Sequence, residues 1–152
     1  MAMVLDVAMY FISRSTPFSR ESVTNLKLQK LLYYAQGFHL AIHGRVLFDD
    51  EIEAWVHGPV IPCVYHEFKH HSYHDIDEKF HKEDYILTPN ETLLLEDVWE
   101  IFKLHSGKDL EKMTHDEEPW IEARRGLSEY SYSDNQIDQD TLRDYFIAEY
   151  LE

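Results

Sequence analysis

The sequence predicts a mainly α protein: a single compact helical domain of six or seven helices around a long central helix, with a small β element near residues 46–57. Three observations support this. Apolar residues recur with a period of about 3.6 residues in several segments. Helix start and stop signals flank those segments, and one short stretch alternates polar with apolar residues. A length of 152 residues suits one domain, residues 1–152, with a hydrophobic core.

The first half of the chain contains the predicted central helix. A shorter helix is expected over residues 3–13, followed by a polar turn. The long helix is expected from about Thr24 to His43, with Gly44 as its left-handed cap. Gly37 lies inside it, where glycine disfavours a helix, so we expect close packing there. The inward stripe is Leu28, Leu31, Leu32, Ala35, Phe38, Ala41 and Ile42.

A strand and a short helix are expected next. Residues 51–56 partly alternate polar with apolar side chains, which indicates a strand. Gly58-Pro59 predicts a sharp turn, with Pro59 at the first position of a new helix that ends near His71. Residues 72–87 are polar and predict an exposed, mostly irregular loop.

The second half predicts further helices. Thr88-Pro89-Asn90-Glu91 is a capping box that begins a helix. A short helix over residues 108–113 leads to Thr114-His115-Asp116-Glu117, which we interpret as a second capping box for a helix that ends at Gly126. A last helix follows a polar loop. The residues expected to face inward are Leu94, Leu95, Val98, Ile101 and Phe102 in the first of these helices and Leu142, Tyr145, Phe146, Tyr150 and Leu151 in the last.

Composition restricts the function classes. The chain has 14 basic and 29 acidic residues, a net charge of −15. Direct nucleic-acid binding is not expected, because phosphate contacts need clustered lysine and arginine. An acidic surface suits a basic partner protein, or serves solubility alone. No apolar run is long enough to span a membrane, and the first residues lack a signal-peptide pattern. With Cys63 as its single cysteine, we expect a cytoplasmic protein without an internal disulfide.

The stretch HEFKH, residues 66–70, matches the H-E-x-x-H pattern of zinc hydrolases. On a helix, His66 and His70 would share one face, with Glu67 as general base. Chance gives such a match at a rate on the order of 7% in a chain this rich in histidine, and Lys69 would place a positive charge beside the dication. We therefore expect no cofactor and no specific metal site, although His66, His70 and His74 can bind metal adventitiously. Third ligands, none singled out by position, would be His74, Glu96 or Glu100.

Three segments carry a family resemblance. TNLKLQKLLYYAQGFHLA, DEIEAWVHGPVIPCVY and THDEEPWIEAR occur in this order, and together they resemble the Panacea domain, a family that includes SocA-like antitoxins and proteins labelled phage-associated. The resemblance covers about residues 3–150. It implies a non-enzymatic antitoxin that binds and neutralises a toxin encoded by a neighbouring gene. It also implies that the protein can act as a proteolytic adaptor for an AAA+ protease.

Two alternatives stay open at this stage. One is a phage-encoded interaction module that acts without a toxin. The other is a zinc-dependent hydrolase built on HEFKH. For the enzyme reading, the sequence shows no Ser-His-Asp arrangement, no phosphate-binding glycine loop and no catalytic carboxylate pair.

The motif residues have structural and partner-binding interpretations. Because Tyr33 and Tyr34 are adjacent, we expect at least one near the surface, where tyrosine favours binding. The partner surface is expected on the exposed side of the long helix, in the 72–87 loop or on the acidic last helix, with Arg124 paired to a carboxylate inside the domain. Candidate partner-binding residues are Lys27, Lys30, Tyr33, Tyr34, Asp75, Asp77 and Glu78. Residues expected to be structural are Leu28, Leu31, Trp55, Gly58, Pro59, Thr114, His115, Pro119, Trp120 and Arg124.

Overall fold

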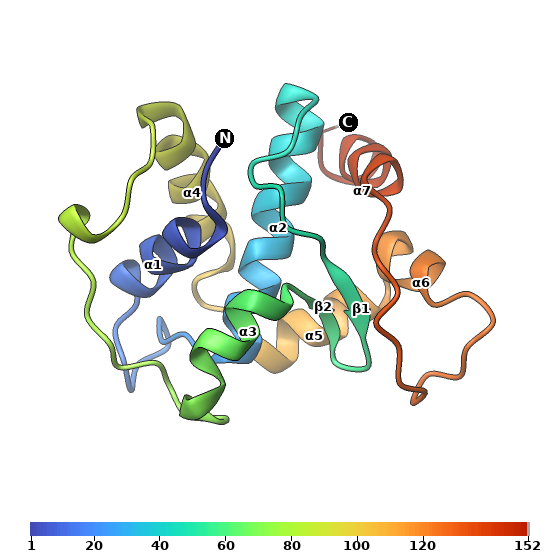
Figure 1. Cartoon of the computed structure of the whole chain (residues 1–152), viewed down its shortest axis with the longest axis horizontal. Coiled ribbons are helices and arrows are strands. Elements are labelled where there is room, and N and C mark those ends of the chain that lie inside the picture. Colours follow the sequence, from blue (N-terminus) through green and yellow to red (C-terminus); the bar gives the residue numbers. More distant parts are fainter. Residues whose placement is uncertain (152) are drawn as a thin grey trace.

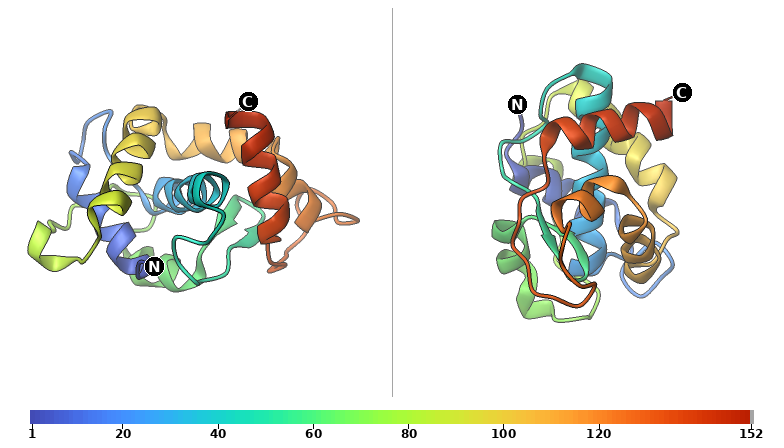
Figure 2. Two further views of the ribbon diagram at one scale, coloured as in Figure 1. Left: turned by 90° about the horizontal axis from the view of Figure 1, so that it is seen from above. Right: turned by 90° about the vertical axis from the view of Figure 1, so that its right-hand side faces the viewer.

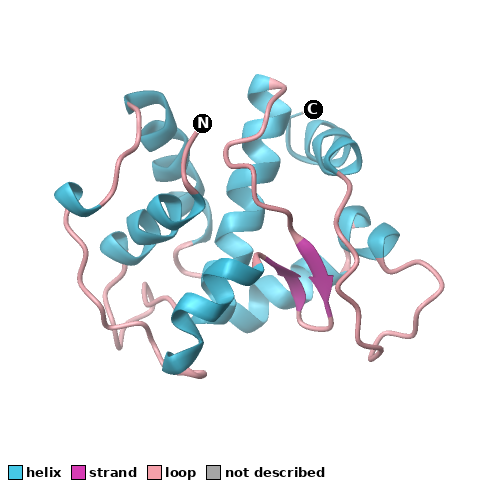
Figure 3. Cartoon of the chain, viewed as in Figure 1, coloured by secondary structure: helices cyan, strands magenta, loops and turns pink. Residues whose placement is uncertain are grey.

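The structure is a computed structural model that describes residues 1–151. Seven α-helices and one hairpin dominate this part of the chain, which confirms the mainly α class (Figure 1, Figure 3). The helices are α1 Val4–Arg14, α2 Asn25–His43, α3 Pro62–Phe68, α4 Pro89–Phe102, α5 Gly107–His115, α6 Glu118–Ala123 and α7 Gln139–Phe146. The strands are β1 Glu53–Trp55 and β2 Gly58–Val60. Two 3₁₀ turns are η1 Lys69–His71 and η2 Lys82–Asp84, and the π-helical segment η3 Ile147–Leu151 follows α7 directly.

Helix α2 is the central helix, as predicted. The left view of Figure 2 shows it nearly end-on, with the other helices around it, and it packs against α1, α3, α4, α5 and α7. From Asn25 to Leu40 every residue except Leu26 is buried. The expectation that the long helix offers an exposed side is therefore wrong for this stretch, because neighbours cover it on all sides.

The ends and the packing of α2 follow the sequence signals. The Thr24 hydroxyl accepts a hydrogen bond from the Lys27 backbone N–H at 3.2 Å, and Gly44 ends the helix at φ 73°. A Cβ on Gly37 would lie 2.5 Å from the ring of Phe146. Glycine at this position therefore lets α7 approach α2 closely, as its unusual place in a helix predicted.

The inward stripes contain three errors. Ile42 and Ile101, near the ends of α2 and α4, are 51% and 54% exposed, and Leu151 is 46% exposed. Successive helical residues point about 100° apart, so Ile101 turns outward where its neighbour Phe102 is buried.

The hairpin differs from the predicted turn. Strands β1 and β2 pair antiparallel, with Trp55 opposite Gly58. The turn therefore lies before Gly58, and Pro59 belongs to β2 instead of starting a helix. Proline is tolerated there because β2 is an edge strand that pairs only with β1 in the sheet. Pro62 instead occupies the first turn of α3.

One of the two predicted capping boxes forms. Thr88 and Glu91 cap α4 as expected. The box at Thr114–Glu117 does not form, because Thr114 lies in the last turn of α5 and its hydroxyl donates to the Glu111 carbonyl at 2.9 Å. Helix α6 begins after Glu117, whose side chain makes no cap.

The 72–87 segment is mostly irregular, as predicted, but it is anchored to the core. Ile76 is fully buried, and its backbone N–H donates to the Val23 carbonyl at 2.8 Å. Phe80, Tyr85 and Leu87 pack partly against the core. The loop is therefore anchored at Ile76 and by these partly buried side chains, while Tyr73 and Ile86 are 80% and 84% exposed. Within the described residues, no helix combines the length and apolarity needed to cross a membrane.

Candidate partner-binding site

Three tyrosines converge on one buried carboxylate. The hydroxyl of Tyr33 donates to Glu117 Oε1 at 2.9 Å, and those of Tyr34 and Tyr150 donate to Oε2 at 3.1 and 2.6 Å. Tyr33 and Tyr34 are both fully buried. The expectation that one of them lies near the surface is therefore wrong: α2 is enclosed, so both tyrosines are covered although they point in different directions.

The charge state of this cluster follows from its burial. Glu117 is 4% exposed. Desolvation raises its pKa, while the three hydroxyl donors stabilise the carboxylate and lower it. Burial and the nearby carboxylate raise the pKa of Tyr33 and Tyr34, so both hydroxyls remain donors. The cluster links α2, the start of α6 and η3 through a satisfied network.

Sequence reasoning missed the role of Glu117, which it assigned to a cap. A usable signal existed, because buried tyrosine hydroxyls need a hydrogen-bond partner. Two adjacent tyrosines on a central helix therefore indicate a buried acceptor elsewhere in the chain.

Lys27 and Lys30 are buried as well, at 2% and 0% exposure, so neither offers an exposed cation. The Lys27 ammonium donates to the Lys103 carbonyl at 2.6 Å and lies 5.5 Å from the Trp99 ring centre. The Lys30 ammonium donates to the Pro59 carbonyl at 3.0 Å. Desolvation lowers the pKa of Lys27 to about 8 and that of Lys30 to about 7.

The hairpin is fitted closely to α2 and α5. A Cβ on Gly58 would lie 2.6 Å from Lys30 Cε and 3.0 Å from the Thr114 hydroxyl oxygen, and Gly58 has a φ of 108°. Both the space and the backbone therefore require glycine. Leu28 and Leu31 of α2 are fully buried in the core.

Side chains of α5, α6 and the following turn hold the backbone of β1. His115 Nε2 donates to the Val56 carbonyl at 2.9 Å, and burial lowers the pKa of this histidine. Trp120 Nε1 donates to the Trp55 carbonyl at 2.8 Å, and its ring stacks on His115 at 4.1 Å. Pro119 is buried in the first turn of α6.

Arg124 also bonds to the backbone. Nη1 donates to the Ala54 carbonyl at 2.9 Å and Nη2 to the Ser131 carbonyl at 2.5 Å. The expected pairing of Arg124 with a carboxylate is wrong, because backbone carbonyls occupy its donors. The guanidinium thus connects β1 to the loop after α6.

The three acidic loop residues separate into two environments. The Asp75 carboxylate accepts the backbone N–H of Phe18 at 2.8 Å, so it ties the loop to the turn before α2. Asp77 and Glu78 lie beside the histidines of η1, with carboxylate oxygens 3.9 and 2.6 Å from His71 nitrogens.

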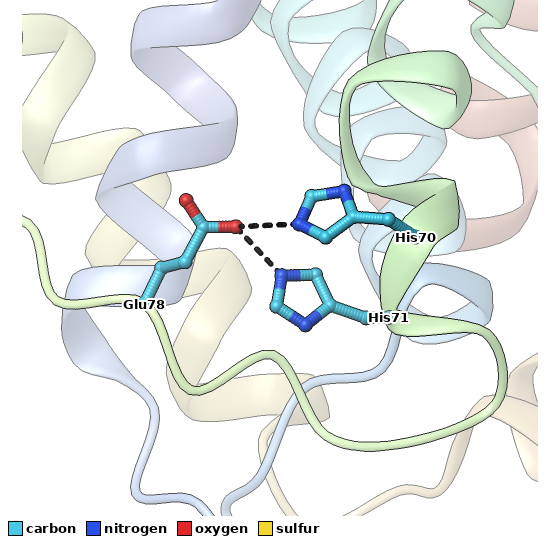
Figure 4. Close-up of side chains that lie close together, drawn as sticks. All are labelled: His70, His71 and Glu78. Carbon is cyan, nitrogen blue, oxygen red and sulfur yellow. Dashed lines mark hydrogen bonds and ion pairs between the residues drawn. The ribbon is translucent and has the colours of Figure 1, made fainter.

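The HEFKH segment does not form the pattern of a zinc hydrolase. Helix α3 ends at Phe68 and a 3₁₀ turn follows, so the regular helical spacing between His66 and His70 is lost. The close group is His70, His71 and Glu78, whose candidate ligand atoms lie within 4.8 Å of one another (Figure 4). His66, His74, Glu96 and Glu100 are outside this group.

A cavity of about 390 Å³ lies between the start of α2, the hairpin and α3. Asn25, Gln29 and Lys30 of α2 border it. Trp55 and Tyr65 border it from the hairpin and α3. Gln29 Oε1 accepts the Ile61 backbone N–H at 2.9 Å, so α2 side chains hold the junction between hairpin and helix in place.

Residues 28–121 match the family described as "Antitoxin SocA-like, Panacea domain". A 46-residue segment is 52% identical to a protein of Caulobacter vibrioides (strain NA1000 / CB15N) described as "Antitoxin SocA". That segment is 30% of this chain and 24% of the relative, so the match spans about a quarter of the relative's length. No solved structure matches the chain.

Proposed function

The chain belongs to the family of SocA-like antitoxins with a Panacea domain, and from this premise we propose that it is a cytoplasmic antitoxin that neutralises a toxin protein by direct binding. The single observation that carries the proposal is the family match, which spans residues 28–121 and therefore includes α2, the hairpin and the start of α6.

The buried polar network supports a binding protein over an enzyme. Its titratable side chains are engaged with protein partners: tyrosine hydroxyls for Glu117, and backbone carbonyls for Lys30, His115 and Arg124. A general acid or base needs a free position from which to reach a substrate. We therefore propose a non-enzymatic role in which the antitoxin covers the active surface of the toxin.

The experiment is growth rescue in bacteria. The neighbouring open reading frame is induced alone, with this protein, and with a Glu117→Ala variant as a control for loss of the folded state. We expect arrest by the neighbour alone, rescue by the wild type, and a complex that co-purifies through size exclusion. The proposal is contradicted if the neighbouring gene product is harmless. It is also contradicted if that product arrests growth and co-expression of this protein does not relieve the arrest although both proteins are soluble.

The adaptor role is a separate proposal from the same family. If the antitoxin delivers its toxin to an AAA+ protease, the toxin's half-life in cells shortens when the antitoxin is present and recovers when the protease gene is deleted. Rescue at an unchanged toxin half-life restricts the mechanism to occlusion.

A further inference from the structure

The cavity beside the hairpin combines an aromatic wall with a positively charged rim. The rings of Trp55 and Tyr65 meet edge to face at 5.0 Å along one side. Tyr73, which is 80% exposed, stands at the opening. Aromatic side chains that remain accessible next to a cavity are typical anchors of protein interfaces.

The charge of this cavity is opposite to that of the whole chain. Lys30, Lys69 and Lys108 border it, together with His57, and no acidic residue among the described ones does so. The chain as a whole carries −15. A larger cavity of about 520 Å³ beside α1 has both signs of charge, since Arg14, Lys82 and Glu96 line it. The concentration of cations is therefore particular to the cavity at the hairpin.

Lys30 supplies an unusual feature of the cavity floor. It has no exposed surface, and the Pro59 carbonyl is the one acceptor in the described structure for an ammonium group that carries three donors. Among the acids, Glu111 acts most strongly on its charge, and the carboxylate oxygens of Glu111 already bind His57 at 2.8 Å and Lys108 at 3.1 Å. A buried cation with so few partners is costly, and burial lowers the pKa of Lys30 to about 7. The exposed Lys69 and Lys108 therefore supply the charge that a partner can reach.

We propose that this cavity anchors the toxin, and that the anchor is an acidic segment of the toxin. Its carboxylate would lie between Lys69 and Lys108 at the rim, and an adjacent apolar side chain would lie on Trp55 and Tyr65. This inference rests on the proposed antitoxin function and identifies the surface that performs it. Charge complementarity selects this occupant, because an acidic protein attracts a carboxylate where cations border a cavity without acids and repels it at its acidic surfaces.

The test measures toxin affinity after reversing two lysines at the rim. In Lys69→Glu/Lys108→Glu both side chains are exposed, so the fold is retained; Lys108 loses a surface pair with Glu111 that is worth little. The matched control is Lys79→Glu/Lys82→Glu, which changes net charge equally at exposed positions outside the cavity. We expect the rim variant to weaken binding by about tenfold or more and the control by less than about threefold.

A second pair of variants tests the aromatic side of the cavity. Tyr73→Ala removes an 80% exposed tyrosine at the cavity, whereas Tyr130→Ala removes an 81% exposed tyrosine after α6. We expect about a tenfold loss of affinity for the first and none for the second. A lysine introduced at the anchoring carboxylate of the toxin would restore binding to Lys69→Glu/Lys108→Glu.

The outcomes separate this proposal from the function on which it rests. If the wild type forms no complex with the toxin, the proposed antitoxin function is contradicted, and so is the proposed anchor. If a complex forms and both reversals weaken it alike, only the anchor is overturned. Inorganic phosphate or ATP that binds the wild type alone and not the rim variant, at an unchanged toxin affinity, assigns the cavity to a small anion and also overturns the proposal.

Discussion

Glu117 and Lys30 are both buried ionisable groups, yet their surroundings differ. Glu117 contacts the central helix and accepts three tyrosine hydroxyls. Lys30 belongs to the central helix, has one carbonyl acceptor and borders a cavity. A fully hydrogen-bonded buried charge holds a structure together, whereas a sparsely bonded one is costly and loses its charge more readily. We propose that the Glu117 cluster is architectural and that the cavity bordered by Lys30 takes part in recognition.

The largest expected effect is on the architectural side. Glu117→Ala leaves the hydroxyls of the buried Tyr33 and Tyr34 and of the partly buried Tyr150 without their acceptor, and each buried unsatisfied group costs about 1–3 kcal/mol. We therefore expect the free energy of unfolding to fall by about 3 kcal/mol or more, measured by urea denaturation. Glu118→Ala is the matched control, because Glu118 is exposed and its oxygen lies 3.8 Å from Arg125. Equal costs for the two variants would remove the architectural role.

The next effect tests the fit between the hairpin and Lys30. Gly58→Ala introduces a methyl group 2.6 Å from Lys30 Cε at a φ of 108°, and we expect a loss of about 2–3 kcal/mol in thermal or urea unfolding. Gly44→Ala provides the control: Gly44 also has a positive φ, 73°, but a Cβ there would meet nothing within 4 Å. The difference between the two variants measures the steric contact together with the greater backbone strain of a φ of 108°. Equal losses would show that the hairpin shifts to accommodate the methyl group.

A third prediction sharpens the contrast through pH. Burial lowers the pKa of Lys30 from 10.5 to about 7. Between these values the unfolded chain binds more protons than the folded one at this site. The contribution of Lys30 therefore raises the free energy of unfolding as the pH rises from about 7 to about 10, and lowers it as the pH falls over the same range. The groups that act on its charge are Glu111 and Lys108, and its contacts are the Pro59 carbonyl and Gly58.

The measurement compares the wild type with Lys30→Met, which keeps the side chain's length and removes its charge. We expect Lys30→Met to be equal or higher in stability near pH 6, with the advantage shrinking as pH rises towards 10. Lys79→Met, at an exposed position, should follow the wild type throughout. Parallel stability curves for wild type and Lys30→Met would mean that Lys30 is charged at all these pH values.

Much of the fold was predictable because local signals agreed with the tertiary structure. The Thr24 and Thr88 caps, the Gly44 terminus and the close approach at Gly37 all follow from short-range chemistry. The Thr114–Glu117 pattern failed because a tertiary demand took precedence: three tyrosines from distant segments needed the Glu117 carboxylate. A local rule cannot report a competing partner that lies 84 residues away in the chain.

The candidate site was less predictable for a related reason. Lysine is mostly exposed in proteins, so Lys27 and Lys30 were expected at the surface together with at least one of Tyr33 and Tyr34, but enclosure of α2 buries all four. The cavity itself is made by side chains from α2, the hairpin, α3 and α5, which only the fold brings together. The family resemblance includes the long helix and the hairpin, but it does not show which of their side chains meet.

The smallest effect is expected at His70, His71 and Glu78. The contact between His71 and Glu78 is short, 2.6 Å, and the His70 and Glu78 side chains are 64% and 39% exposed, but that of His71 is only 12% exposed. Water competes for the ion pair, so His71→Ala should change stability by about 1 kcal/mol, mainly through lost packing of the ring near Phe68. A chelator such as EDTA should leave the melting temperature and the growth rescue unchanged. The matched histidine variant is His57→Ala, because His57 is an exposed histidine that pairs with Glu111 at 2.8 Å. A melting temperature that falls on chelation in the wild type but not in His71→Ala would instead assign a bound metal to this cluster and add a third kind of region to the comparison.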